Sequence, residues 1–165
     1  MGHVRRDYGM VLAWAAGTLA VDQAAKWAVS RWLGPGESVG VAGRLIRLTH
    51  VTNPGAAFGL FQGRQELFVA ATLLVFVLAV VMAGRVGPKS GLALAGLGLA
   101  AGGAAGNLVD RLRTGSVIDF IDLSVWPVFN LADTGIVVGV ALLFWYLVRH
   151  HAPAVSAEGD SRSRS

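Results

Sequence analysis

Long apolar runs separated by more polar segments dominate the chain. Each of four runs is close to the length at which an α-helix crosses a lipid bilayer: about residues 9–33, 67–83, 91–108 and 131–148. The intervening segments 34–65 and 109–129 are longer and more polar. An even number of spans places both termini on one side of the membrane and the two long loops on the other. The pattern predicts an all-α membrane protein with four transmembrane helices.

The first run contains charged residues at Asp22 and Lys26, which share one helix face because they are four positions apart. They form either a structural ion pair or part of a site, and the spacing leaves both open. The first twenty residues also resemble a secretory signal. Because apolar sequence resumes after Asp22 and continues to Leu33, we expect one uncleaved span.

Small residues mark the third run. Gly98, Gly102 and Gly106 repeat every four positions and therefore lie along one helix face. Rows of this kind allow helix backbones to approach closely in a membrane. We interpret the row as a helix-packing surface.

The first long loop predicts a short β-hairpin. Val39 and Val41, and then a second set of β-forming residues from Leu45 to Val51, flank a glycine-containing turn. The sequence 53–55 then reads Asn-Pro-Gly, which is typical of a turn. The small residues of segment 56–58 are compatible with backbone lying close to a ligand.

Composition supports a membrane protein and narrows its chemistry. The chain is 54% hydrophobic and only 15% charged, with a mean hydropathy of +0.57, whereas soluble domains have about a quarter of their residues charged. The net charge of +4 is too small and too scattered to indicate nucleic-acid binding. The absence of cysteine excludes thiolate catalysis and disulfides. We expect one domain over residues 1–151 and a disordered tail over 152–165.

The predicted topology brings the polar residues near the spans to one membrane boundary. These residues are Asn53, Asn107, Asp110, Arg111, Asp119, Asn130 and Asp133, with Asp22 displaced toward the same side. Ionisable groups beside hydrocarbon are costly, so such a cluster indicates function. For Asn130 and Asp133, helix capping is a competing interpretation.

Clustered carboxylates permit one particular chemistry. Two neighbouring carboxyl groups do not both ionise easily, so one accepts a proton from water while the other donates to a substrate carbonyl. This is peptide hydrolysis without a metal or a covalent intermediate. No histidine has a ligand spacing near the acids, so no cofactor or metal is expected. Spacing alone does not distinguish Asp119 from Asp122 as a member of the pair.

The composition of the chain does not exclude two other classes of function. A carboxylate-lined proton or ion transporter would also use membrane acids, although its acids should be distributed across the bilayer. A non-catalytic helical scaffold would explain the glycine row but not the clustered acids.

Five short motifs resemble the lipoprotein signal peptidase (signal peptidase II) family of membrane aspartyl proteases. In family order they are Asp22-x-x-x-Lys26, Asn53-x-Gly55-Ala56-Ala57-Phe58-Gly59, Gly106-Asn107-x-x-Asp110-Arg111, Val117-x-Asp119-Phe120 and Phe129-Asn130-x-Ala132-Asp133. The resemblance selects Asp119, rather than Asp122, as the partner of Asp133.

The resemblance implies roles for the remaining polar residues. Asp119 and Asp133 would be the catalytic pair. The substrate would contact Asn53, Arg111 and Asn130, and the supporting residues would be Asp22, Lys26, Asn107 and Asp110. The first long loop would form a small extracytoplasmic β-cradle.

The resemblance also implies a substrate and a location. The protein would cleave lipid-modified prolipoproteins before their diacylglyceryl-modified cysteine, in contact with membrane lipid, and globomycin-type cyclic peptides would inhibit it. It would be a multi-pass protein of the bacterial inner (plasma) membrane with cytoplasmic termini and an active site near the outer face. The density of basic residues in the 84–89 connection favours the same orientation.

Overall fold

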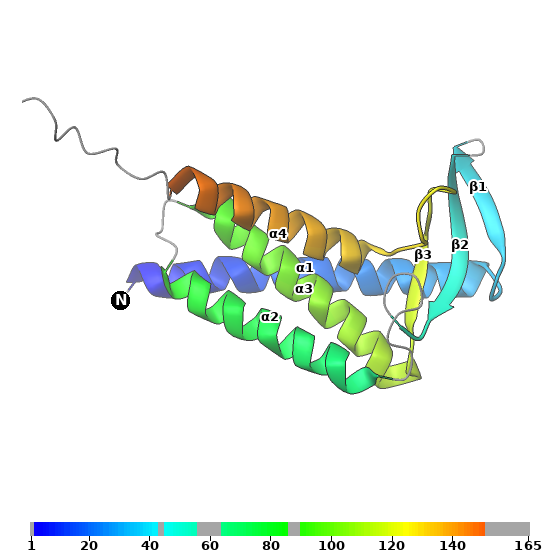
Figure 1. Ribbon diagram of the computed structural model, residues 1–165, viewed down its shortest axis with the longest axis horizontal. Coiled ribbons are helices and arrows are strands. Elements are labelled where there is room, and N and C mark those ends of the chain that lie inside the picture. The colour runs from blue at the N-terminus through cyan, green and yellow to red at the C-terminus, as the bar shows by residue number, and fades with distance from the viewer. Residues whose placement is uncertain (1, 43–44, 56–63, 86–89, 151–165) are drawn as a thin grey trace, which may run out of the picture.

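The computed structural model describes residues 2–42, 45–55, 64–85 and 90–150. Within this part of the chain it contains four helices and a three-stranded sheet (Figure 1). In chain order the elements are α1 (Gly2–Trp32), β1 (Ser38–Ala42), β2 (Ile46–Asn53), α2 (Gln65–Arg85), α3 (Gly91–Thr114), β3 (Val117–Asp122) and α4 (Leu131–His150). Residues 56–58 and the predicted tail 152–165 lie outside the described residues.

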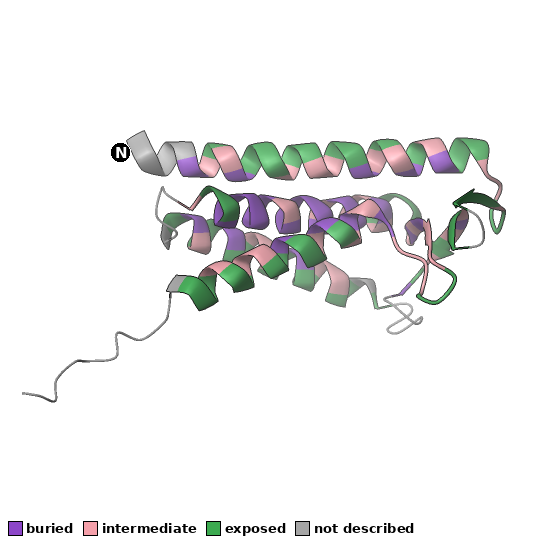
Figure 2. Cartoon of the chain, turned by 90° about the horizontal axis from the view of Figure 1, so that it is seen from above, coloured by how far each residue is buried: buried purple, intermediate pink, exposed green. Residues whose placement is uncertain are grey.

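The four helices form a bundle, and the sheet lies at one end of it (Figure 1). Helix α1 begins and α4 ends at the opposite end, so the chain enters and leaves the bundle far from the sheet. Helix α3 is central because it packs against each of the other three helices. Buried residues accordingly concentrate on α3 (Figure 2).

Glycines let α3 occupy this central position. A Cβ atom at Gly98 would lie 2.7 Å from the carbonyl oxygen of Val11, and one at Gly102 would collide with the carbonyl oxygen of Ala15. Both contacts are with α1, so the row at Gly98, Gly102 and Gly106 does serve helix packing as predicted. Gly106 differs from the other two because its nearest neighbour is the carboxylate of Asp22.

Among the described residues, three helices are long and apolar enough to cross a membrane: Glu66–Gly84, Gly91–Thr114 and Leu131–Arg149. Helix α1 is longer than these but is not among them, since Asp22, Gln23 and Lys26 interrupt its apolar sequence. The protein is therefore membrane-embedded and mostly helical.

The sheet is antiparallel in the order β1-β2-β3. The predicted hairpin is present as β1 and β2. In the second pair, Val51 is opposite Asp119 and Asn53 is opposite Val117. This register brings the end of β2 to the part of β3 that carries Asp119.

The prediction of a polar loop over residues 109–129 was the main error of the sequence analysis. Helix α3 continues through Asp110 and Arg111 to Thr114, and β3 follows almost immediately. The helix ends where Gly115 adopts a left-handed conformation with φ 76° and donates its N–H to the carbonyl of Arg111 at 2.9 Å. Polar residues end a hydrophobic span but do not end a helix, and the glycine was the better stop signal.

Candidate active site

Asp119 of β3 and Asp133 of α4 line one cavity of about 240 Å³ at the sheet end of the bundle. The polar residues of the cavity come from four elements and one turn: Asn53, Gly55, Asn107, Arg111, Asp119 and Asp133. Its apolar residues are Val117, Trp126, Pro127, Val128, Phe129 and Val137. The fold therefore brings together the two acids that the motifs selected.

Both oxygens of Asp119 accept a hydrogen bond from an amide. Asn53 Nδ2 donates to Oδ2 at 2.9 Å and Asn130 Nδ2 donates to Oδ1 at 2.7 Å. Asp119 is only 3% exposed. This burial raises the pKa of Asp119 to about 6, with a smaller contribution from the charge of Asp133, against the opposing effect of the two amides.

Asp133 is held at the first turn of α4 by a reciprocal cap. Its backbone N–H donates to Asn130 Oδ1 at 2.9 Å, and its Oδ2 accepts the Asn130 N–H at 3.4 Å. Asn107 Nδ2 donates to Asp133 Oδ1 at 2.7 Å. Asn130 thus caps α4, as the capping interpretation predicts, and also contacts Asp119.

A buried polar cluster lies behind the cavity. Lys26 Nζ is 2.8 Å from Asp22 Oδ2, 2.8 Å from Asp110 Oδ2 and 3.0 Å from Asn107 Oδ1. Asp22 Oδ1 also accepts the backbone N–H of Ala132 at 2.9 Å. The ion pair predicted between Asp22 and Lys26 exists, and it connects α1 to both helices that carry site residues.

Gln23 belongs to this cluster and was missed from the sequence. Its Nε2 lies 2.9 Å from Asp110 Oδ1, 3.2 Å from the carbonyl oxygen of Gly106 and 3.3 Å from Asp22 Oδ2. The available signal was its place in an apolar run, one residue after Asp22 and three before Lys26.

Arg111 lies across the mouth of the site. Its guanidinium donates to the carbonyl oxygen of Gly55 at 3.2 Å and to that of Asn107 at 3.4 Å. The same group lies 3.9 Å from the ring centroid of Phe68 on α2. The side chain therefore joins the turn after β2 to helices α2 and α3.

Asp122 lies apart from the other acids. Its carboxylate accepts the backbone N–H of Ser124 at 2.8 Å and the hydroxyl of Thr49 at 2.9 Å. These two bonds lower the pKa of Asp122. Because Asp122 is three residues from Asp119 on one strand, the two side chains point to opposite faces.

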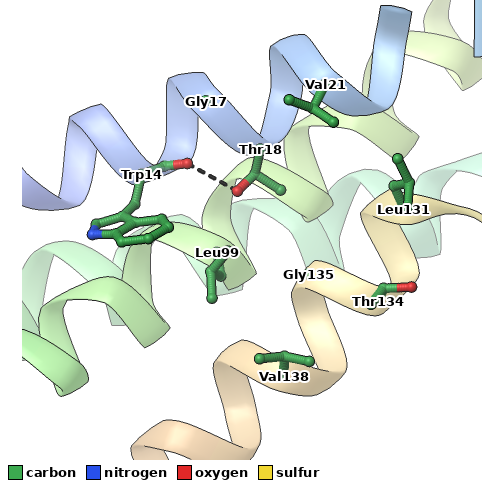
Figure 3. Close-up of a pocket in the computed structure, with 9 residues that line it drawn as sticks. All are labelled: Trp14, Gly17, Thr18, Val21, Leu99, Leu131, Thr134, Gly135 and Val138. Carbon is green, nitrogen blue, oxygen red and sulfur yellow. Dashed lines mark hydrogen bonds between the residues drawn. The ribbon is translucent and has the colours of Figure 1, made fainter. Parts of the chain in front are cut away.

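A larger cavity lies elsewhere in the bundle, and its lining includes no charged group. It is an apolar groove of about 480 Å³ between α1 and α4, with Leu99 of α3 behind it (Figure 3). Its two hydroxyls are bonded within their own helices, from Thr18 to Trp14 O at 2.9 Å and from Thr134 to Asn130 O at 3.0 Å. The groove therefore has no group that could take part in catalysis.

Among the described residues, no group of three or more histidines, cysteines or acids could hold an ion. The arrangement is instead that of two carboxylates on a common cavity, with amide donors directed at both.

Comparison with known proteins gives one consistent family. Residues 14–149 match the family model described as signal peptidase (SPase) II. A lipoprotein signal peptidase of Pelotomaculum thermopropionicum is 49% identical over 130 residues, which cover 79% of this chain and 86% of that protein. A lipoprotein signal peptidase of Moorella thermoacetica is 47% identical over 130 residues, which cover 79% of this chain and 87% of that protein.

Solved structures agree with the sequence relatives. A bacterial membrane enzyme solved by the in meso method at 2.3 Å resolution superposes with a TM-score of 0.80 at 26% identity, over 94% of this chain and 95% of that chain. A second bacterial membrane enzyme, solved at 1.9 Å by the same method, gives a TM-score of 0.77 at 28% identity, over 86% of this chain and 94% of its own. All five motifs lie within the matched residues 14–149, and the chain belongs to the signal peptidase II family.

Proposed function

We propose that the protein is an intramembrane aspartyl endopeptidase that removes signal peptides from prolipoproteins, cleaving before the diacylglyceryl-modified cysteine. The names of its relatives supply the substrate class. The observation that supports the aspartyl mechanism most strongly is the convergence of Asp119 and Asp133 on one cavity, bridged by Asn130.

In the proposed mechanism the two carboxyl groups share one proton. The ionised group accepts a proton from a water molecule while the oxygen of that water attacks the scissile carbonyl carbon. The protonated group donates its proton to the carbonyl oxygen, which gives a neutral tetrahedral diol. A proton then passes from the acid that received it to the leaving amine, a diol hydroxyl returns its proton to the other acid, and the carbon–nitrogen bond breaks.

Amide and cationic groups position the substrate in this proposal. Asn53 and Asn130 hold Asp119, and Arg111 borders the cavity beside Gly55, where a peptide backbone would pass. An adjoining groove of about 310 Å³ leads from Asp133 along α2, α3 and α4. Its apolar residues suit the hydrophobic segment of a signal peptide: Phe68, Ala71, Val75, Ala104 and Ile136.

We further propose four membrane spans, with α1 as the span that carries the buried ion pairs. In this topology the domain covers residues 1–151 and both termini are cytoplasmic. The sheet lies near the outer face of the bacterial inner membrane, next to the two acids. The pairing of Lys26 with Asp22 and Asp110 supports a membrane position for α1, because it compensates charges that hydrocarbon would otherwise exclude.

The proposed partners are a lipid-modified prolipoprotein and membrane lipid, and a globomycin-type cyclic peptide should inhibit cleavage. A transporter has no comparable support. The described acids near the cavity gather at the sheet end, and those of the cluster are tied to Lys26 rather than spaced as a path.

The test is cleavage of a lipidated prolipoprotein peptide by purified protein in detergent or lipid. Asp119→Asn and Asp133→Asn should each reduce kcat by at least about 1000-fold, since each removes one proton-transfer group. Asp122→Asn is the matched control and should retain most activity. An active Asp119→Asn protein, or an inactive but folded Asp122→Asn protein, would refute the assignment.

A further inference from the structure

Three asparagine side chains direct their NH₂ groups at the two carboxylates. Asn53 and Asn130 donate to Asp119, and Asn107 donates to Asp133. An amide side chain has donors at one end and an acceptor at the other, so a rotation by half a turn would present oxygen to the carboxylate instead. Each orientation therefore needs a partner that fixes the oxygen end.

The backbone fixes two of the three amides. Asn53 Oδ1 accepts the N–H of Gly55 at 3.0 Å, and Asn130 Oδ1 accepts the N–H of Asp133 at 2.9 Å. A backbone N–H is always a donor. These two orientations consequently do not depend on the identity of another side chain.

Asn107 is different because a charged side chain fixes it. Its Oδ1 accepts from Lys26 Nζ at 3.0 Å and from Asn130 Nδ2 at 3.2 Å. An ammonium group has three donors and no acceptor, so only the oxygen of Asn107 can face it. Asp22 and Asp110 hold the ammonium in place from its other sides.

We infer that Lys26 is a positioning residue that acts through Asn107: by binding the amide oxygen, it compels Asn107 to donate its NH₂ to Asp133. This inference rests on the proposed function. A donor at 2.7 Å attracts the carboxylate oxygen of Asp133, whereas an amide oxygen there would repel it. Lys26 thus determines which group of Asn107 faces the catalytic pair, although it has no hydrogen bond of its own with Asp119 or Asp133 among the described residues.

The surrounding charges do not provide a substitute. The charged groups around Lys26 and Asp133 in the described part of the chain are Asp22 from α1, Asp110, Arg111 and Arg113 from α3, and Asp119 from β3. Arg111 donates to backbone carbonyls of Gly55 and Asn107. In the described part of the chain, Lys26 is therefore the charged side chain that is bonded to the amide oxygen of Asn107.

The test compares the pH dependence of kcat/KM for a lipidated peptide. Lys26→Met removes the ammonium and keeps the length of the side chain. We expect the acidic limb of its profile to move up by about one pH unit, the equivalent of one lost hydrogen bond to a charged group. At a pH on that limb kcat/KM should fall about tenfold, with the loss in kcat and KM changed less than about twofold, because the substrate contacts remain.

Two controls separate the orientation of the Asn107 amide from the charge of Lys26 and from a general loss of stability in the buried cluster. Lys26→Gln retains an N–H donor for Asn107 without the charge. Because the charge of Lys26 also helps to lower the pKa of Asp119, the limb of this variant should move, but by less than half as far as that of Lys26→Met. Gln23→Met removes three hydrogen bonds of the same cluster without touching Asn107. It should lower the Tm and leave the limb in place.

Lys26→Met leaves two buried carboxylates without their cation and can prevent folding. The double variant Lys26→Met with Asp22→Asn neutralises one of them, and the new amide oxygen can still accept the Ala132 N–H. It should show the same shift of the limb. An unchanged limb in this variant, or an equal shift in Lys26→Gln or Gln23→Met, would overturn the inference, whereas a wild-type protein that does not cleave the peptide would instead refute the proposed function.

Discussion

The polar cavity beside Asp119 and the apolar groove between α1 and α4 both border helix α4, but they differ in kind. The groove, at about 480 Å³, is twice as large as the polar cavity of about 240 Å³. In the groove the hydroxyls of Thr18 and Thr134 are bonded back to their own helices. In the cavity, amides from β2, from α3 and from the residue before α4 point at two carboxylates. Directed donors, rather than volume, therefore distinguish the region that can perform chemistry.

The largest effect should come from removing a donor in the polar cavity. Asn130→Ala deletes the 2.7 Å bond to Asp119 and the side-chain cap of Asp133. We expect kcat for a lipidated peptide to fall at least about 100-fold, as for the loss of a preorganised donor in other enzymes. Single-turnover cleavage by folded protein measures this, and activity within tenfold of the wild type would remove the distinction between the two regions.

A second effect should appear in the pH dependence of stability. The folded-state pKa of Asp119 is raised from 3.8 to about 6, so the stability linked to its proton is fully present below about pH 4 and lost as pH rises to about 6. A shift of this size corresponds to at most about 3 kcal/mol. The stability of the wild type minus that of Asp119→Asn, measured by unfolding in detergent, should fall across this window. A difference independent of pH would contradict the burial of this carboxyl group.

A third comparison uses one glycine beside the buried polar cluster behind the cavity and one in the apolar groove. A Cβ atom at Gly106 would lie 2.6 Å from Asp22 Oδ2, whereas one at Gly17, in the apolar groove, would meet nothing within 4 Å. Gly106→Ala should therefore destabilise the protein by about 2 kcal/mol through overpacking. Gly17→Ala should be neutral or stabilising by up to about 1 kcal/mol, because alanine favours the helix. Thermal unfolding of the two variants side by side measures this difference in stability. Equal Tm values for the two variants would contradict the prediction.

The smallest effect should come from the apolar groove itself. The hydroxyl of Thr18 donates to the carbonyl oxygen of Trp14 in its own helix, and Thr18→Val replaces it with a methyl group of similar size. We expect kcat/KM to change by less than about twofold and stability by less than about 0.5 kcal/mol, as for substitutions away from structural features. A tenfold loss of cleavage would show that the groove takes part in the reaction.

The apolar runs and the β-forming residues of the first loop were enough to predict the four helices and the hairpin, because burial periodicity is a local property. Helix ends were less accurate. Asp110 and Arg111 appeared to belong to a loop on hydropathy, although the helix continues to Gly115. The strand β3 was missed because its six residues form a strand by pairing with β2, which is distant in the sequence.

The residues of the site could be named from motifs, but their connections could not. That Asn130 both caps α4 and binds Asp119, and that Asp119 and Asp122 face different partners, depends on strand register and helix packing. Gln23 was missed for the same reason, since its partners Asp110 and Gly106 are more than eighty residues away.

The bond from the Ala132 N–H to Asp22 has a consequence for biogenesis. It joins the first helix to the start of the last across 110 residues of sequence. While a nascent chain still lacks its final hydrophobic segment, Asp22 has no such partner and Asp133 has not yet been delivered. If Asp133 has the proposed catalytic role, the chain could not cleave a substrate until α4 has been added to the bundle.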